Sequence, residues 1–239
     1  YNVIKINDKA FAGSSIESLS FQYNSSLKII GNSAFENTKI RKIFLPRNLN
    51  KLEKFWCKGA DELNEIEIDP NNLFFSNKNG FLTYKNETTS QIIFASREFK
   101  GDFLIPEETT KIGEYSFANR KGLQSIKSEA SILRSIGSFS FFGCENLTHV
   151  VLNQETSLTL FGFSFSDCIN LSTFEISCQM LEIHDDCFYN CTSLSTFKVM
   201  KSDTIKIHQN SFRSCTNLQE ISFNNSYEIQ IESYHFEYS

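Results

Sequence analysis

The chain has 239 residues and a net charge of −5, from 23 Lys+Arg against 28 Asp+Glu, which is long enough for a sizeable core. No apolar run approaches the roughly 18 residues of a membrane span, and the lack of any Lys/Arg block argues against a nucleic-acid or anionic-membrane surface. The 10 Gly, 3 Pro and 14% aromatic residues exclude a collagen-like or disordered chain.

The first residues carry no Met, no basic segment and no apolar leader. The stretch from Tyr1 to Ile4 resembles the middle of a structural element. We therefore expect the chain to be an excised or processed piece that is truncated at both ends.

One apolar pattern recurs from the start of the chain, and each copy is named here by its central anchor. The anchors are Phe11, Phe35, Cys57, Phe117, Phe141, Phe165, Phe188, Phe212 and Phe236. Successive anchors are 24, 22, 60, 24, 24, 23, 24 and 24 residues apart. A unit this short cannot bury its own apolar face, so the units must stack. The pattern predicts a single repeat solenoid over residues 1–239, with about nine units of about 24 residues.

Each unit is expected to contain two short strands. Leu147–Leu152 ends in period-2 alternation, and a second alternating stretch follows at Leu158–Leu160. We expect parallel pairing between units, in a mostly parallel, right-handed β-solenoid. A Gly often follows the second strand, where we expect a tight turn. The next stretch, Ser/Ala-Phe-x-x-Cys, suits a short helical or 3₁₀ turn with Phe and Cys inward.

The gap of 60 residues between two anchors indicates an insertion at residues 69–111. Within it, Phe81–Tyr84 and Gln91–Ala95 flank a polar turn, which predicts a β-hairpin. The preceding unit is irregular, because Trp56 occupies the small-residue position and Cys57 the Phe position. We expect a local bulge there.

These units resemble the BspA-like class of leucine-rich repeats, whose unit runs Leu-x-x-Ile-x-Leu-Pro-x-x-Leu-x-x-Ile-Gly-x-x-Ala-Phe-x-x-Cys. The matching segments are Leu45-Pro46, Ile105-Pro106, Ile112-Gly113 to Phe117, and Ile136-Gly137 to Cys144. The resemblance covers essentially the whole chain, and the segment 69–111 looks like a hairpin-bearing variant of the family.

The resemblance implies a cell-surface or secreted protein of the kind found in bacteria and protists, where some members are adhesins. The partner would then be a protein, such as a host matrix or cell-surface protein. The bias toward Phe, Asn and Lys suggests a eukaryotic protist.

Four of the seven cysteines share one repeat position, namely Cys144, Cys168, Cys191 and Cys215. A disulfide pair or a thiolate metal site is the functional alternative. We favour a column of buried thiols that behave as small hydrophobes, because metal ligands must converge on one point. Cys57 and Cys187 also occupy core positions, and Cys178 alone falls outside the core pattern.

The four histidines are His149, His184, His208 and His235. His184 and His208 replace the Gly after the second strand, one unit apart, so zinc binding is an alternative. No Cys-x-x-Cys or His-x-x-x-His spacing supports it, and we expect surface turn residues with no metal and no cofactor. The chain also lacks phosphate-loop, nucleophile-elbow and dinucleotide motifs, so no catalytic residue is assigned and no enzyme is expected.

Six Asn-x-Ser/Thr sequons are candidate N-glycosylation sites. They lie at Asn24, Asn86, Asn146, Asn170, Asn190 and Asn224. Because Asn, Ser and Thr are abundant, chance accounts for most of them.

The residues between the inward apolar positions of the first strand must point outward, and stacking places them in two columns on a concave sheet. One column is Ser18, Lys42, Glu65, Ser125, His149, Thr173, Thr196 and Glu220, and the other is Ser20, Phe44, Glu67, Lys127, Val151, Glu175, Lys198 and Ser222. Mixed charges exclude a simple polyanion or polycation ligand.

Phe44, His149 and Val151 are the candidate hot spots of this face for a protein partner. The plainer alternative is that scattered exposed apolar side chains are normal. The chain is therefore interpreted as a non-enzymatic protein-interaction module, with a purely structural spacer in a longer surface protein as the alternative.

Overall fold

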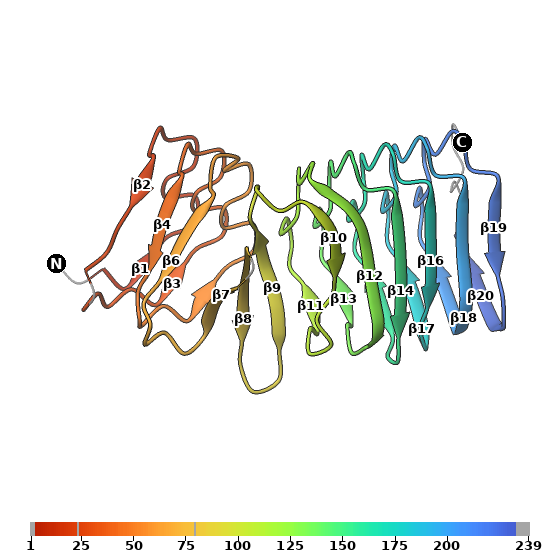
Figure 1. Ribbon diagram of the computed structural model, residues 1–239, viewed down its shortest axis with the longest axis horizontal. Helices are drawn as coiled ribbons and strands as arrows, with labels where there is room; N and C mark the ends of the chain where they lie inside the picture. The colour runs from red at the N-terminus through yellow and green to blue at the C-terminus, as the bar shows by residue number, and fades with distance from the viewer. Residues whose placement is uncertain (1–2, 23, 79, 233–239) are drawn as a thin grey trace. The chain divides into compact units, whose positions relative to one another are not determined.

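The computed structural model describes residues 3–22, 24–78 and 80–232, and shows a solenoid of short parallel strands (Figure 1). The last partial repeat expected at Phe236 lies outside the described residues. Among the residues described there is no helix, and hence none that could cross a membrane. The chain divides into two compact units, residues 1–88 with 93–98, and residues 89–92 with 99–239.

The first unit contains two parallel ladders of strands. One ladder consists of β1 (Lys5–Ile6), β3 (Ile29–Ile30) and β5 (Lys51–Leu52). The other consists of β2 (Ser18–Leu19), β4 (Lys42–Leu45) and β6 (Glu65–Ile68). These are the two strands per coil that the period-2 patterns predict.

The segment after β6 also belongs to the core of the first unit. It forms β7 (Phe75–Lys78) and β8 (Phe81–Lys85), which pair antiparallel, followed by β9 (Ser90–Ala95). The side chains of Phe75, Leu82 and Phe94 are buried in the same cluster as Phe35. The strand β7 was not predicted from the sequence, and the hairpin between β8 and β9 stays a prediction.

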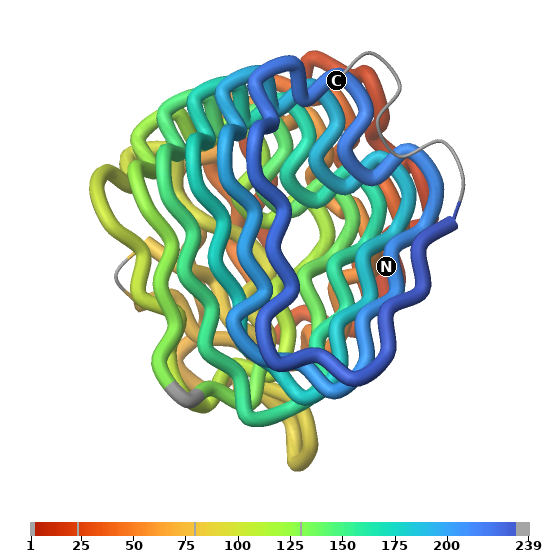
Figure 2. The backbone as a smooth tube through the Cα atoms, turned by 90° about the vertical axis from the view of Figure 1, so that its right-hand side faces the viewer, coloured from red at the N-terminus to blue at the C-terminus, as the bar shows by residue number. Residues whose placement is uncertain are grey.

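The second unit repeats the two ladders over more coils, and Figure 2 shows these coils one behind another. Its first ladder consists of β10 (Gly101–Leu104), β12 (Leu123–Ser131), β14 (His149–Gln154), β16 (Thr173–Ser177), β18 (Thr196–Ile207) and β19 (Glu220–Phe223). Its second ladder consists of residues Gln91–Ile92 of β9, β11 (Lys111–Ile112), β13 (Ser135–Ile136), β15 (Leu158–Leu160), β17 (Met180–Ile183), the later residues of β18, and β20 (Ser226–Ile231).

The connection between the two ladders varies in length from coil to coil. Three residues, 155–157, join β14 to β15, whereas two residues, 178–179, join β16 to β17. The two coils stay in parallel register on both ladders across this difference, with His149 opposite Thr173 and Leu158 opposite Leu181. The long segment that follows β6 leaves the solenoid at the same kind of connection.

A column of buried Phe rings forms the centre of the second unit. Phe141 and Phe165 stack with ring centroids 5.1 Å apart, and Phe188 and Phe212 continue the column at 5.5 and 5.2 Å. All four side chains are fully buried. Phe174 lies against Phe165 and Phe188 in edge-on contacts. The inward assignment of Phe141, Phe165, Phe188 and Phe212 is therefore confirmed.

The stretch that carries each anchor is a hydrogen-bonded turn, so the expected helical or 3₁₀ turn is wrong. Its amides alternate between local and inter-coil acceptors. Phe142 donates to Phe139, whereas Phe141 donates to the carbonyl of Ser164 in the next coil, 2.8 Å away. In a helix, all of these amides would donate to carbonyls of the same segment. Phe139 and Gly143 also have left-handed φ values of 57° and 65°, which a helix does not contain.

The coil that contains Trp56 keeps the regular turn, and the expected bulge is absent. The amide of Phe35 donates to the carbonyl of Trp56 at 2.8 Å, as Phe141 donates to Ser164. The indole of Trp56 is buried and meets the ring of Phe35 edge-on, with centroids 6.4 Å apart. The indole thus supplies the aromatic contact that Cys57, which is half-buried, does not.

The four cysteines of the column are buried and are not joined in disulfides. The thiols of Cys144, Cys168, Cys191 and Cys215 each donate to the carbonyl of the Phe anchor in the preceding coil, at Sγ–O distances of 3.1 to 3.2 Å. Burial raises the pKa of Cys144 and of Cys215 to about 12. Cys178 is buried too, and its thiol donates a hydrogen bond to the carbonyl of Met180. The expectation that Cys178 lies outside the core is therefore wrong.

Replacing Phe165 by Ala should lower the free energy of unfolding by about 3–5 kcal/mol, because the substitution leaves a cavity within the ring column. Chemical denaturation followed by circular dichroism measures the loss. Tyr227→Ala is the control, since Tyr227 is 90% exposed and its truncation should cost little. Equal stabilities of the two variants would contradict the burial of the column.

The four column thiols should react slowly with a maleimide or disulfide reagent in the native protein and rapidly after denaturation. The reason is that a buried thiol with a raised pKa forms little thiolate. Mass spectrometry of samples quenched over time identifies the labelled residues. Fast native labelling of all four, or a disulfide between any two, would refute this assignment.

Candidate functional site

The outward residues of the first ladder line up as the sequence predicts, within each unit. In the first unit Lys42 lies opposite Ser18 and Glu65, and Phe44 lies opposite Glu67. We define the first-unit face as Ser18, Ser20, Lys42, Phe44, Glu65 and Glu67. Strand β4 alternates between half-buried and buried residues from Lys42 to Leu45, which sends Phe44 to this face and its neighbours Ile43 and Leu45 to the core.

The first-unit face is hollowed beside Phe44. The hollow has a volume of about 330 Å³. Its lining residues are Ser18, Leu19, Ser20, Phe21, Lys42, Phe44 and Glu67. Two aromatic side chains, Phe44 and Phe21, thus lie beside hydroxyls and an ion pair in one open depression. This combination of an apolar surface with polar groups around it is typical of a protein-binding site.

The charges of the first-unit face are paired with each other. The ammonium of Lys42 lies 2.8 Å from a carboxylate oxygen of Glu65 and 2.8 Å from one of Glu67. The hydrogen bond from Lys42 lowers the pKa of the Glu67 carboxyl, and the bonds to Glu65 and Glu67 raise the pKa of Lys42. The pairing limits the net charge that a partner would meet.

In the second unit the predicted columns also have the predicted register. We define the second-unit face as Lys127, His149, Val151, Thr173, Glu175, Thr196, Lys198 and Glu220. His149 is exposed, Val151 is half-buried, and Lys198 lies 3.5 Å from Glu220. Ser125 differs from the expectation, because its side chain is buried and donates to Asp102 at 2.6 Å.

Two residues of the second-unit columns were missed. Asp102 lies opposite Ser125 and Leu104 lies opposite Lys127, on strand β10. Leu104 is 62% exposed and therefore adds an apolar side chain beside Lys127. The alternation of Asp102, Phe103 and Leu104 is a usable signal for this strand, although the spacing of the anchors places the segment within the insertion.

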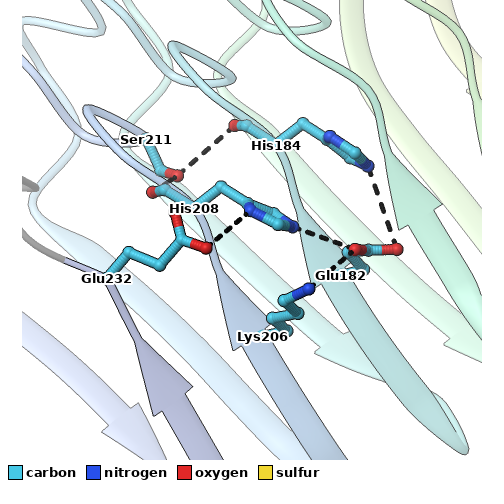
Figure 3. Close-up of polar contacts among 6 residues, drawn as sticks. All are labelled: Glu182, His184, Lys206, His208, Ser211 and Glu232. Atoms are coloured by element: carbon cyan, nitrogen blue, oxygen red, sulfur yellow. Dashed lines mark hydrogen bonds and ion pairs between the residues drawn. The ribbon is translucent and has the colours of Figure 1, made fainter.

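His184 and His208 lie together, on a different part of the second unit. Their rings stack with centroids 4.8 Å apart, and Phe161 extends the stack at 5.0 Å from His184. The carboxylate of Glu182 contacts Nε2 of both imidazoles, and Glu232 lies on the opposite side of the His208 ring (Figure 3). A hydrogen bond with His208 lowers the pKa of Glu182. Glu182, His184 and His208 are a group of side chains that could hold a metal ion. His235 lies outside the described residues.

The sequon asparagines differ in how they are bonded. Asn24, Asn86, Asn146, Asn170 and Asn224 are exposed, and Asn190 is half-buried. The side-chain amides of Asn146 and Asn170 donate to the carbonyls of Lys121 and Glu145 in the preceding coil, at 2.7 and 2.8 Å. At these two sites the Asn side chain links two coils, a structural role that does not involve a glycan. Glycosylation stays a prediction.

The chain matches the family model of the BspA-type leucine-rich repeat region, with six copies, over residues 1–96, 87–205 and 155–239. No curated protein sequence is significantly similar to it. Its fold is similar to several solved bacterial structures. One is a leucine-rich repeat protein from Eubacterium ventriosum, 24% identical, with a TM-score of 0.71 over 97% of this chain and 67% of that one.

Two further structures share the fold. A leucine-rich cell surface protein from Faecalibacterium prausnitzii is 19% identical, with a TM-score of 0.72 over 95% of this chain and 63% of that one. The pneumococcal vaccine antigen PcpA is 17% identical, with a TM-score of 0.56 over 98% of this chain and 67% of that one. The chain thus spans about two thirds of the length of these proteins.

Substituting Lys42 by Met should raise the pH at which the Glu67 carboxyl titrates, because the hydrogen bond that lowers its pKa is lost. NMR titration of the Glu67 side-chain carbon measures the change. Lys198→Met is the matched control, since Lys198 contacts Glu220 instead and should leave Glu67 unaffected. An unchanged Glu67 titration in Lys42→Met would show that the pair is absent in solution.

Proposed function

Because the chain belongs to the BspA-type leucine-rich repeat family, we propose that it is a non-enzymatic protein-interaction module. It binds a protein partner through the outward side of its first-ladder strands. The observation that carries the proposal is the hollow of the first-unit face, where the aromatic rings of Phe44 and Phe21 border polar and paired charged groups. Repeat folds are scaffolds, so the argument rests on this surface and not on the fold.

Phe44 is the centre of the proposed site. It is only half-buried although its strand neighbours Ile43 and Leu45 are fully buried, so its ring contributes to the surface as well as to packing. Aromatic side chains with polar surroundings supply most of the binding energy at protein interfaces. Val151 with His149 on the second-unit face is a second, smaller contact area of the same chemistry.

A location at the cell surface or in the secreted fraction belongs to the same proposal. Two proteins of similar fold are described as a cell surface protein and as a vaccine antigen. A host matrix or cell-surface protein is the partner class that fits this location. Sequence beyond both ends of the chain would test the location directly, through a signal peptide or an anchor.

The binding site can be tested once a partner is found by screening matrix and cell-surface proteins. Phe44→Ser should weaken the affinity at least about tenfold, and Val151→Ser should weaken it less, because loss of a central aromatic contact costs about 2 kcal/mol or more. Biolayer interferometry measures both. Leu73→Ser is the control, because Leu73 is 87% exposed and lies outside both faces.

A third variant separates the strand faces from the β8–β9 connection. Deleting residues 69–111 would remove the buried side chains of Phe75, Leu82, Phe94 and Phe103 and so disrupt the core. Replacing residues 86–88 by Gly and Ser leaves that core intact. Loss of binding in this variant, with unaltered affinity in Phe44→Ser and Val151→Ser, would move the site to the connection. Binding to no screened protein would favour a structural spacer.

A further inference from the structure

The second ladder carries a compact set of nitrogen and oxygen donors that the proposed protein-binding face does not use. The carboxylate of Glu182 contacts the imidazoles of His184 and His208 (Figure 3). Its carboxylate oxygens lie 2.9 Å from Nε2 of His208 and 3.8 Å from Nε2 of His184. One donor atom from each of the three residues lies within 4.8 Å of the others. All three side chains are partly exposed.

A second carboxylate fixes the orientation of one imidazole. Glu232 Oε1 lies 3.1 Å from Nδ1 of His208, on the side away from Glu182. In metal sites a ligating histidine almost always donates its other ring N–H to such a carboxylate, which orients the ring and raises its basicity. Glu232 therefore leaves Nε2 of His208 as the ligating nitrogen. This contact is a second observation, independent of the three donors, that points to an ion.

The backbone under the two histidines is also held in place. The hydroxyl of Ser211 donates to the carbonyl of His208 at 2.6 Å and lies 3.3 Å from the carbonyl of His184 (Figure 3). Strand β17, which carries Glu182, and strand β18, which ends one residue before His208, are paired in register, with Ile183 opposite Ile207. The three donors thus project from fixed backbone positions.

We propose that Nε2 of His184, Nε2 of His208 and the carboxylate of Glu182 bind a divalent transition-metal ion of the zinc class. Two imidazoles and a carboxylate suit such an ion, whereas calcium and magnesium prefer oxygen donors. Donors about 2.1 Å from zinc in a tetrahedron lie about 3.4 Å from each other, so the donors need only a small approach. The ion takes the place of the proton on Nε2 of His208, and one coordination position is left for water.

Two features of the cluster define what binding requires. The stacked rings lie 19° from parallel, so each must turn about its Cβ–Cγ bond to aim Nε2 at the ion. The ammonium of Lys206 lies 3.8 Å from Glu182 and repels a bound cation. Lys206 therefore opposes metal binding. If Glu182 binds the ion, removal of Lys206 should strengthen the metal affinity, whereas a purely structural role of Glu182 predicts no such change.

The experiment titrates the full chain, freed of metal by chelation, with Zn²⁺ by isothermal calorimetry. Co²⁺ is used in parallel, because its visible absorption reports tetrahedral coordination. We expect one ion per chain in the native protein. His184→Gln, His208→Gln and Glu182→Gln should each weaken the affinity at least about tenfold, and Glu232→Gln about tenfold. Lys206→Met should strengthen it about threefold.

Glu155→Gln is the matched control, since Glu155 is an exposed carboxylate outside the cluster. The metal affinity of this variant should equal that of the native protein. Circular dichroism without metal checks that each variant is folded. If a histidine variant is unfolded, Glu232→Gln and Lys206→Met, which alter more exposed side chains, decide the question. No uptake of Zn²⁺ at micromolar concentrations would overturn the proposal. Native affinity in either histidine variant or in Lys206→Met would also overturn it.

Discussion

The parallel hydrogen bonds between coils impose a single repeat distance, and every other contact in the solenoid has to conform to it. Neighbouring strands lie about 4.8 Å apart. The buried Phe rings stack at 4.9 to 5.5 Å, close to this distance. The column thiols repeat one hydrogen bond to the coil before, and half of the turn amides donate to the coil after. A coil alone has neither a complete core nor complete hydrogen bonds, so its stability comes from its neighbours.

Features that repeat could be predicted from the sequence, because the period identifies equivalent residues without any knowledge of geometry. The Phe anchors, the cysteine column and the register of Lys42 with Glu65 are of this kind. Features that depend on a local conformation could not. The turn around Phe141 looks helical by spacing, and only its left-handed φ values and its bonds to the next coil distinguish it. The indole of Trp56 contacts the ring of Phe35 from the small-residue position of the repeat and not from the anchor position, and the sequence pattern does not predict this contact.

The same repeat distance makes surface chemistry out of residues that are far apart in the chain. Lys42 reaches Glu65 and Glu67, 23 and 25 residues away, because those residues lie one coil further along. Glu182, His208 and Glu232 meet across three successive coils for the same reason. The spacing of one coil is enough to predict that His184 lies beside His208. The approach of Glu182 and Glu232 could not be predicted, because it depends on side-chain directions. Inward positions are constrained by packing, whereas outward positions are free to form such groups.

The connection between the two ladders tolerates changes in its length. It contains three residues between β14 and β15 and two between β16 and β17, and after β6 it opens into a long segment that forms further strands. The coils of β14 with β15 and of β16 with β17 stay in register on both ladders through this change of one residue. Length can therefore vary at this corner without shifting any buried ring, whereas one added residue within a strand would turn its core side chains outward. Within each unit, the solenoid is thus a carrier for grafted loops, one at this corner of each coil.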